Sequence, residues 1–556
     1  MGELQESDQS TYAKSARDEE EETIGYYQPS HHLQPPKETI IMGVHQDRWY
    51  HYVNMGLLRR KFDLKRTVVI VTAVLTFLML AFEITHHELY SLVPFRSISV
   101  PGQCTTWPVG HDGRYTPETV MAAQSNETSS TTSSAPRLDS LAPPGGWKKP
   151  EGIKVVALIF YGRKRTVDFL DCYIQQNLVS NGGYLDEVRF MVHTSNKEDL
   201  DYLQDLVAKS EGYYHVVDTG ECEGMNFSCI WDSVVEDDTI YVKIDDDIIF
   251  IHPDAIPQLV HTRIATPHAY AVSANLVNSP LTGYEHFHYG AIHPFLPDPR
   301  AKPSHPAAES WRPSERGYFP NSSMPTFNVS SLSDAEVEEL VYPKRPYFGH
   351  PFLLLSDNPF DLMKSPMGLN HIRGAKVGVE TAYRVAWESW AVAAQQQYSL
   401  LKNLEENAVA RYFFGSPQSF PTTTTTAPNG TNQSTAVPER FRHHALNAGG
   451  PGGEQLYNTQ YRRYNLNFIA VWGSDIAAAL PIAGDDEQDI TVDIPLRTHR
   501  PFLIDTRAVV GHLSFFPQHE GVRETDLLDR WRAFANEMIC APGNRKSPFD
   551  KRCPGF

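Results

Sequence analysis

The stretch Thr239-Ile-Tyr-Val-Lys-Ile-Asp-Asp-Asp-Ile-Ile-Phe-Ile251 places three consecutive aspartates between two apolar runs. The first run predicts a buried strand that ends in the aspartates. Because the side chains of a strand alternate between its faces, we expect Asp245 and Asp247 to point one way and Asp246 the other. Three carboxylates in an apolar frame repel one another and need a cation or hydrogen-bond donors. Mg²⁺ or Mn²⁺ is the natural partner for such an oxygen cluster, and a solvated acidic turn is the alternative interpretation.

Short apolar runs alternate with helical patterns on both sides of the aspartates. Strands are predicted at 155–161, 187–193, 213–217 and 269–274, and helices at 166–178, 197–207, 227–235 and from about 253. This alternation predicts an α/β protein with a doubly wound, mostly parallel sheet covered by helices on both faces. Ligands of such sheets bind at the carboxyl ends of the strands. The aspartates lie at such an end, which favours the metal site over the solvated turn.

A basic tripeptide follows the first predicted strand, at another carboxyl end. Arg163 and Arg165 flank Lys164, and a predicted helix begins directly after them. Guanidinium groups match the geometry of phosphate oxygens, and a helix N-terminus favours anions. A solvated basic loop explains the tripeptide at least as well when it is considered alone. Beside an acidic metal cluster on the same edge of the sheet, the pattern favours a phosphate site.

The second half of the chain carries fewer signals. Residues 377–404 form one long helical pattern, in which Trp387, Trp390 and Tyr398 have the spacing of core aromatics. Further on, residues 508–516 have the pattern of an apolar strand with His512 inside it. A lone histidine in a core is more often structural than a ligand.

A compact acidic turn follows the apolar stretch AAALPIAG. It contains Asp485, Asp486 and Glu487 and precedes the alternating sequence ITVDIP. A carboxylate near the edge of the sheet can serve as a general base if its pKa suits the task.

The chain of 556 residues has a formal net charge of −18, and its pI is near 5.7. A nucleic-acid partner would require a basic face, so this balance argues against one. Residues 1–66 are polar, include an acidic run at 18–22, and predict a cytoplasmic tail that is largely disordered.

One segment resembles a membrane span. Residues 67–84 carry no charge before Glu83, and as a helix they would extend about 27 Å, which suits a thin early-secretory membrane. Basic residues precede the segment and acidic residues follow it, so the positive-inside rule predicts a cytoplasmic N-terminus and a lumenal remainder. A cleaved signal peptide is disfavoured because the apolar stretch starts too deep in the chain. A buried core helix is the alternative.

The cysteines and the glycosylation sequons all lie after this segment, as expected for a lumenal region. Cys222 could pair with Cys229, and Cys540 with Cys553, although connectivity cannot be read from spacing. The sequons begin at Asn126, Asn226, Asn321, Asn328, Asn429 and Asn432.

Segments rich in Ser, Thr, Pro and Gly divide the predicted lumenal part. Residues 85–150 have this composition and predict an extended stem. Similar stretches near 296–330 and 421–453 predict surface insertions. The remainder of 151–556 is expected to form one large globular unit.

Together these features resemble Golgi type II glycosyltransferases of the GT-A fold. The shared layout is a cytoplasmic tail, a single span, a stem and a nucleotide-sugar domain. The triplet in YVKIDDDIIFI resembles the DxD signature, and especially the DDD form of β-1,3-galactosyltransferase and Fringe-type enzymes. The chain also resembles a group of fungal glycosyltransferase-like proteins in the stretches IFYGRKRTVDFLDCYIQQNLVSNGGYLDEVRF and ANLVNSP. The resemblance covers residues 151–290 well and 470–520 loosely.

The resemblance implies roles for the acidic triplet and for one histidine. Asp247 would bind Mn²⁺ or Mg²⁺ directly, and Asp245 and Asp246 would contact the metal, the ribose or the sugar. His512 would correspond to the C-terminal histidine that binds the metal in many GT-A enzymes.

The resemblance also implies a base and a phosphate site. Asp486, or its neighbours Asp485 and Glu487, would match the acidic xED element that supplies the base in inverting members, although the order here is Asp-Asp-Glu. Arg163 and Arg165 would add positive charge near the diphosphate of the donor.

The sequence therefore predicts a metal-dependent glycosyltransferase in the Golgi or ER membrane, with its catalytic domain in the lumen. It would move a sugar from a nucleotide sugar, most often UDP-linked in this class, to a glycan, glycoprotein or glycolipid acceptor. Two other classes remain open. A membrane-anchored lectin or adhesion module would be mainly β and would hold Ca²⁺. A glycoside hydrolase would use paired carboxylates and need no metal.

Overall fold

The computed structural model of the chain describes residues 138, 140–143, 145–210, 212–217, 219, 227–302, 310–355, 359–414, 455–541, 544 and 546. The chain divides into the units Met1–Phe95 and Arg96–Phe556, and every described residue belongs to the second. The predicted tail, span, most of the stem and the insertion near 421–453 lie outside the described residues. No helix in the described part is long and apolar enough to cross a membrane.

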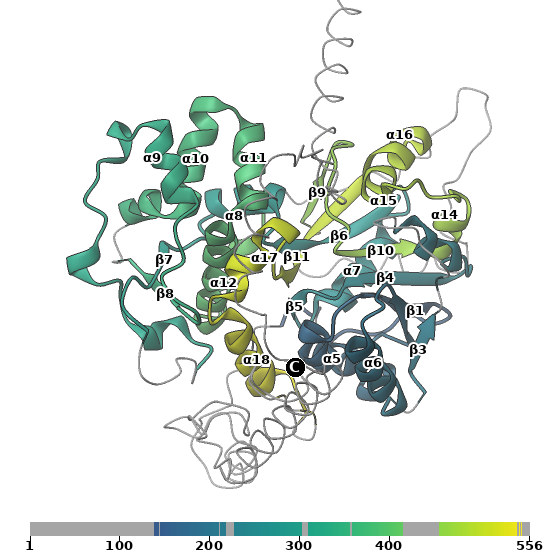
Figure 1. Cartoon of the computed structure of the whole chain (residues 1–556). Coiled ribbons are helices and arrows are strands. Elements are labelled where there is room, and N and C mark those ends of the chain that lie inside the picture. Colours follow the sequence, from purple (N-terminus) through teal and green to yellow (C-terminus); the bar gives the residue numbers. More distant parts are fainter. Residues whose placement is uncertain are drawn as a thin grey trace, which may run out of the picture. The chain divides into compact units, whose positions relative to one another are not determined.

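A nine-stranded sheet forms the centre of the described region (Figure 1). Its strands are β1 Lys154–Tyr161, β2 Glu187–Val192, β3 Tyr214–Val217, β4 Thr239–Asp245, β5 Ile248–Ile251, β6 Ala271–Val277, β9 Leu456–Asn458, β10 Phe468–Trp472 and β11 Phe502–His512. Their order is β3-β2-β1-β4-β10-β6-β11-β5, and β9 pairs with β11.

The strand directions confirm the predicted α/β sheet with mostly parallel strands. The four strands β3, β2, β1 and β4 are parallel neighbours, and β6 is parallel to β11. The three strands β5, β9 and β10 run in the opposite direction. The described part is therefore not the mainly β structure that a lectin or adhesion module would have.

Helices connect and cover the strands. They are α5 Lys164–Gln176, α6 Lys197–Ala208, α7 Ala255–Ala265, α8 Pro280–His288, α9 Asp334–Val341, α10 Pro366–Val377, α11 Val379–Glu388, α12 Trp390–Glu405, α14 Gly473–Ala477, α15 Asp486–Gln488, α16 Ile494–Thr498, α17 His519–Arg523 and α18 Leu527–Met538. The 3-10 turns are η2 Val179–Asn181, η3 Ser228–Ser233, η4 Pro313–Arg316, η5 Asn321–Ser323, η6 Val329–Ser331, η7 Pro359–Lys364, η8 Val409–Tyr412 and η11 Phe516–Gln518. A π-helical turn, η10 Asp489–Asp493, links α15 to α16.

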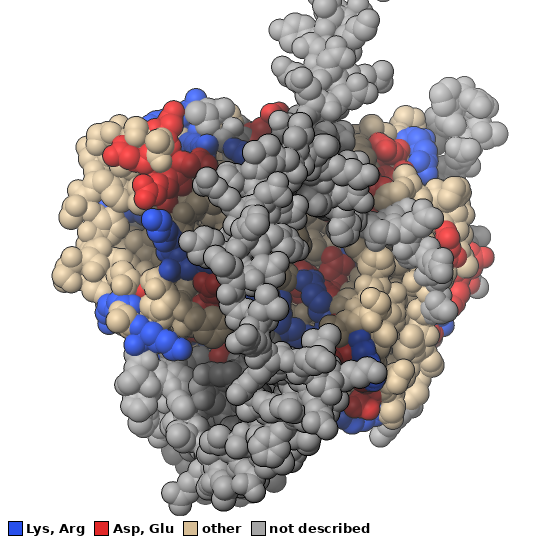
Figure 2. Space-filling view, in the orientation of Figure 1, with Lys and Arg blue, Asp and Glu red and all other residues tan. Residues whose placement is uncertain are grey.

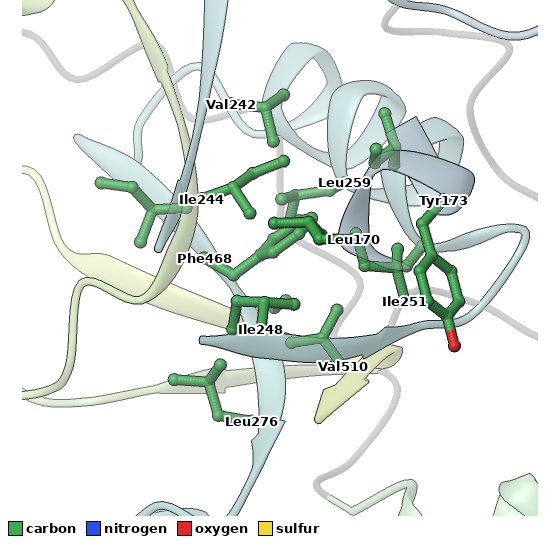
Figure 3. Close-up of a cluster of buried hydrophobic side chains, with 14 of the residues drawn as sticks. Leu170, Tyr173, Val242, Ile244, Ile248, Ile251, Leu259, Leu276, Phe468 and Val510 are labelled. Atoms are coloured by element: carbon green, nitrogen blue, oxygen red, sulfur yellow. The ribbon is translucent and has the colours of Figure 1, made fainter. Parts of the chain in front are cut away.

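The core lies between the sheet and helices such as α5 and α7 (Figure 3). Ile244 and Ile248, which border the aspartate triplet, are both fully buried in it. Removing such side chains from water is the main favourable term in folding. The apolar runs on both sides of the triplet therefore hold its backbone in place, and the aspartates emerge where the core ends.

The predicted single helix over 377–404 is wrong. The chain forms α11 and α12 there, and the two helices are separated at Ser389, whose backbone is extended. The Ser389 hydroxyl accepts a hydrogen bond from Val392 N at 3.3 Å, as an N-cap serine does when it satisfies a free amide of the first turn. Tyr398 of α12 is fully buried, in agreement with its prediction as a core aromatic.

Helix α12 lies between the main sheet and a smaller one. It contacts β6 and also the two-stranded antiparallel sheet of β7 Phe295–Pro297 and β8 Phe352–Leu354. Helices α8, α10 and α11 pack around α12 or one another on this side (Figure 1). The described part of the Pro-rich stretch near 296–330 contributes β7 and the turns η4 to η6.

A disulfide joins Cys172 of α5 to Cys540, two residues after α18. The suggested pairing of Cys540 with Cys553 is therefore wrong. Helices α5 and α18 contact each other, and this packing brings together two cysteines that are distant in the sequence. Cys229 is also disulfide-bonded, and its partner lies outside the described residues.

Candidate functional site

The aspartate triplet lies at the carboxyl end of β4, but only its first member belongs to the strand. β4 ends at Asp245, and Asp246 and Asp247 form a turn before β5 begins at Ile248. The expected alternation of the three side chains is therefore wrong, because the strand period does not extend into a turn. Arg163 Nη2 donates to Asp246 Oδ1 at 2.6 Å and to Asp247 Oδ2 at 3.1 Å. Asp246 and Asp247 thus converge on one guanidinium group.

Strand β5 brings the triplet next to His512. It pairs with β11, and His512 lies opposite Ile248 at a register shift in this pairing. Leu513 N donates to the backbone oxygen of Asp247 at 3.0 Å. His512 Nε2 lies 3.5 Å from Asp247 Oδ2. Two of the three predicted metal ligands, distant in sequence, are therefore neighbours.

One oxygen of Asp247 has no hydrogen-bond donor among the described residues. Asp247 is 8% exposed, and its Oδ1 atom is buried without a partner. Burial alone would raise the pKa of this carboxyl, but the charges of His512 and Arg163 outweigh burial and lower it. A buried, ionised oxygen without a donor is costly unless a ligand satisfies it.

The residues present fit a divalent cation that is completed by substrate. Asp247 offers a carboxylate oxygen, a ligand type that suits Mn²⁺ and Mg²⁺, and His512 offers an imidazole nitrogen beside it. Among the described residues, no group of three or more His, Cys, Asp or Glu side chains is arranged to hold a metal ion. The remaining ligands would have to be water and phosphate oxygens, as is usual for Mg²⁺ sites that act on nucleotides.

Asp245 contacts a different set of residues from Asp246 and Asp247. Its Oδ1 accepts from Lys243 Nζ at 2.5 Å, and its Oδ2 accepts from Asn467 Nδ2 at 2.8 Å. Burial raises the pKa of Asp245, although Lys243 opposes this effect. Lys243 also lies over the ring of Phe160, 4.2 Å from its centroid. Both Lys243 and Asn467 were missed by sequence reasoning, since each lies in a largely apolar stretch without a recognisable motif.

Asp246 is held in place by the loop after β1. Gly162 N donates to its Oδ2 at 2.9 Å, and Arg163 Nε donates to the same atom at 3.2 Å. A Cβ at position 162 would lie 3.3 Å from this oxygen, so a side chain would crowd the carboxylate. Burial raises the pKa of Asp246 against the opposing charge of Arg163. The basic tripeptide is therefore part of the same site as the acidic triplet.

A second histidine, His519, connects the two predicted phosphate ligands. Its Nε2 lies 2.8 Å from Arg163 Nη1 and 2.8 Å from Arg165 Nη2. A guanidinium can only donate, so Nε2 must accept and the ring is neutral. Burial, together with Arg163 and Arg165, lowers the pKa of His519 to about 4. No sequence signal marked this residue, which begins the short helix α17.

Positive charge is in excess around Arg165. Burial, followed by the charges of Arg523 and Arg163, lowers the pKa of Arg165 to about 10. Like charges held together in a partly buried place favour an anionic ligand. In the space-filling view, basic and acidic side chains lie side by side near the middle of the face shown (Figure 2).

The acidic turn forms the start of a helical segment. Asp485 is the N-cap of α15 and accepts from Gln488 N at 3.1 Å and from Arg463 Nη1 at 2.6 Å. Asp486 Oδ2 accepts from Trp231 Nε1 at 2.9 Å. Glu487 Oε1 accepts from Arg463 Nε at 2.8 Å.

Burial and two basic residues act on the pKa of Glu487. Burial raises the pKa of Glu487, while Arg463 and, less strongly, Lys243 oppose the rise. Lys243 is the residue that binds Asp245. The charge of Lys243 therefore acts on Glu487 as well as on Asp245.

Comparisons with known proteins give little further information. No protein-family model matches the chain, and no curated protein matches it. Among solved structures, the chain is similar to 4-diphosphocytidyl-2C-methyl-D-erythritol synthase from Anaerococcus prevotii, with 16% sequence identity and a TM-score of 0.17. The match covers 23% of this chain and spans about half of that enzyme, 56% of its length. At so low a TM-score, the match does not bear on the arguments that follow.

Proposed function

We propose that the protein is a metal-dependent glycosyltransferase that uses a nucleotide sugar as donor and a glycan, glycoprotein or glycolipid as acceptor. The observation that carries the proposal is the position of Asp247 and His512 beside Arg163 and Arg165. Asp247 keeps a buried oxygen without a donor, which suits a cation, and the arginines suit a diphosphate. A carboxylate, an imidazole and two guanidinium groups at the carboxyl edge of an α/β sheet match what a metal-bound diphosphate requires.

Each part of the proposed site has a distinct task. When bound, Mn²⁺ or Mg²⁺ would neutralise the diphosphate and act as a Lewis acid. Asp247 and His512 would hold the ion, and Arg163 and Arg165 would bind and orient the phosphates. Asp245 and Asp246, fixed by Lys243 and Arg163, would line the donor side of the site.

A carboxylate of the acidic turn would accept the proton of the acceptor hydroxyl. Of the three candidates, Glu487 is favoured because burial raises its pKa. A higher pKa makes a carboxylate a better base at neutral pH. Asp486 remains the second candidate, since it is held by Trp231, and Asp485 the third.

The proposed location is the Golgi or ER membrane, with a single type II span at 67–84 and a stem at 85–150. The span and the stem rest on the sequence pattern alone. The sequons at Asn321 and Asn328 are both exposed, as acceptors of a lumenal glycan must be.

The direct test is a donor screen on the full chain in detergent. Purified protein is incubated with Mn²⁺ and each common nucleotide sugar, and nucleotide release is measured with and without EDTA. The proposal expects release from at least one donor, stopped by EDTA. Release of sugar from a glycan in the presence of EDTA, without any use of nucleotide sugars, would favour the glycoside hydrolase instead.

A further inference from the structure

Asn278 has a backbone conformation that side-chain-bearing residues seldom adopt. It follows β6, is fully buried, and has a φ of +66°. Only glycine adopts this left-handed region freely, and asparagine tolerates it better than most other residues. Such a conformation persists where surrounding contacts hold it, and it often marks a functional constraint.

The contacts that hold Asn278 come from two glutamines. Its backbone N donates to Gln396 Oε1 at 3.2 Å, and Gln396 Nε2 donates back to Asn278 Oδ1 at 3.3 Å. Its Nδ2 donates to Gln518 Oε1 at 3.1 Å and to Leu513 O at 3.1 Å. Helix α8 leaves room for this arrangement, since a Cβ on Gly283 would lie 2.6 Å from Gln396 Oε1.

The carbonyl oxygen of Asn278 is then left to face His512. It lies 3.2 Å from His512 Nδ1. A carbonyl oxygen can only accept, so the proton of the imidazole is on Nδ1. In the neutral ring the lone pair is therefore on Nε2, the atom that lies 3.5 Å from Asp247 Oδ2.

The His512 ring is restrained on other sides as well. Gln397 Nε2 donates to the His512 backbone oxygen at 2.5 Å. The ring of Phe515 packs edge-on against the imidazole, with the centroids 4.5 Å apart. Both His512 and Gln397 are buried, so the imidazole has little freedom to rotate.

We infer that Asn278 is a positioning residue, whose left-handed carbonyl sets the tautomer and direction of His512 so that Nε2 can bind the cation proposed for this site. The inference rests on the proposed function. A hydrogen bond from the far nitrogen of a metal-binding histidine to a carbonyl group fixes the ring and makes it a better ligand. Gln396 and Gln518 act one step further out, by holding the Asn278 backbone in its unusual conformation.

The experiment measures Mn²⁺ binding to the full chain without nucleotide, with free Mn²⁺ followed by electron paramagnetic resonance. Asn278→Gly keeps access to positive φ but loses the side-chain bonds, and Asn278→Ala loses both. We expect Kd for Mn²⁺ to rise about tenfold in Asn278→Gly and more in Asn278→Ala. Gln396→Met and Gln518→Met should each raise Kd, and these variants carry the test if the Asn278 variants do not fold.

Gln395→Met is the matched control. Gln395 is a buried glutamine of the same helix, and it bonds with Met367 N, His293 O and Ser365 Oγ instead of the site. It should lower the Tm as the other variants do and leave the Kd for Mn²⁺ unchanged. If Asn278 has a merely structural role, the variants of Asn278, Gln396 and Gln518 should lower the Tm and leave the Kd for Mn²⁺ unchanged, as Gln395→Met does.

Two outcomes overturn the inference in distinguishable ways. If the wild-type chain binds Mn²⁺ and folded Asn278→Gly and Gln396→Met bind it equally well, the positioning role is wrong and the proposed function stands. If the wild-type chain binds no more Mn²⁺ than Asp247→Ala does, the metal site itself is wrong, and the positioning role fails with it.

Discussion

The Asp247–His512 pair and the acidic turn at 485–487 are both parts of the proposed site, but their carboxylates are satisfied differently. Asp247 keeps one buried oxygen without a donor among the described residues. Asp485 and Glu487 are held by Arg463, and Asp486 by Trp231. A buried oxygen without a donor is costly and is relieved by a ligand, whereas a carboxylate with a donor is already stabilised. We therefore expect ligand binding at the first region and orientation or proton transfer at the second.

The largest loss is expected from Asp247→Asn. This change removes the charge that the proposed cation needs while keeping the size of the side chain. We expect nucleotide release to fall by more than about a hundredfold, and Mn²⁺ affinity to fall with it. Asp201→Asn on α6 is the control, because Asp201 is exposed and pairs with Lys197 of the same helix. Normal turnover in folded Asp247→Asn would show that Asp247 does not bind a cation that the reaction needs.

Glu487→Gln should rank next, with a fall in kcat of about a hundredfold if this carboxylate is the base. Asp486→Asn should cost less, because Asn can still accept the hydrogen bond from Trp231. Asp485→Asn should stay within about twofold of wild type, since this exposed N-cap position tolerates Asn. The measurement is kcat with a saturating donor for all three variants. A larger fall for Asp486→Asn than for Glu487→Gln would move the base to Asp486.

The pH profile sharpens the same assignment. Burial raises the pKa of Glu487 above its ordinary value of 4.5, so this carboxyl becomes protonated at a higher pH than usual. A base works only when deprotonated, and the rate should therefore fall, about tenfold per pH unit, as the pH drops below the raised pKa. In Glu487→Gln this acid limb should disappear from the plot of kcat against pH. A limb that persists in the variant belongs to another group.

A smaller effect is expected from Arg163→Lys. Lysine keeps the charge but cannot bind Asp246 and Asp247 through a planar fork or reach His519 in the same way. We expect the KM for the nucleotide sugar to rise about tenfold. Arg300→Lys is the control, since Arg300 is an exposed arginine that pairs with Asp298. Equal KM values for wild type and Arg163→Lys would remove Arg163 from the donor site.

The smallest effect should come from His519. His519→Leu removes the acceptor that holds Arg163 and Arg165 together, and one net hydrogen bond contributes about 1 kcal/mol. The KM for the donor should rise about fivefold. His519→Gln can still accept through its side-chain oxygen and should restore most of the loss. If leucine and glutamine behave alike, His519 only fills space.

Much of the first half of the fold could be predicted from the sequence. Strands such as β1 and β4 are apolar along nearly their whole length because their side chains are buried on both faces of the sheet. Continuous apolar runs separated by helical patterns therefore predicted most elements from 154 to 277 to within a few residues. The helix predicted at 227–235 is wrong, because the chain forms only the 3-10 turn η3 Ser228–Ser233 there. The same pattern placed the aspartate triplet and the basic tripeptide at one edge of the sheet, where the structure also has them.

Other features depended on how distant segments pack. The pairing of Cys172 with Cys540 follows from contact between α5 and α18. The break at Ser389 was missed because a helical period continues across it. Asp246 and Asp247 both meet Arg163 because β4 ends at Asp245 and the next two residues form a turn.

By itself, the sequence determined the α/β class, which strands are buried, and which acidic and basic residues meet at the end of β4. These features depend on local periodicity and charge. Only the tertiary structure decided which atoms meet there: Nε2 of His512 beside Oδ2 of Asp247, His519 between two arginines, and Lys243 bonded to Asp245. The physical reason is that β5 leaves the turn and pairs with β11 rather than with β4. Pairing between distant strands has no local sequence signal, and it decides which carboxylate oxygen is left without a donor.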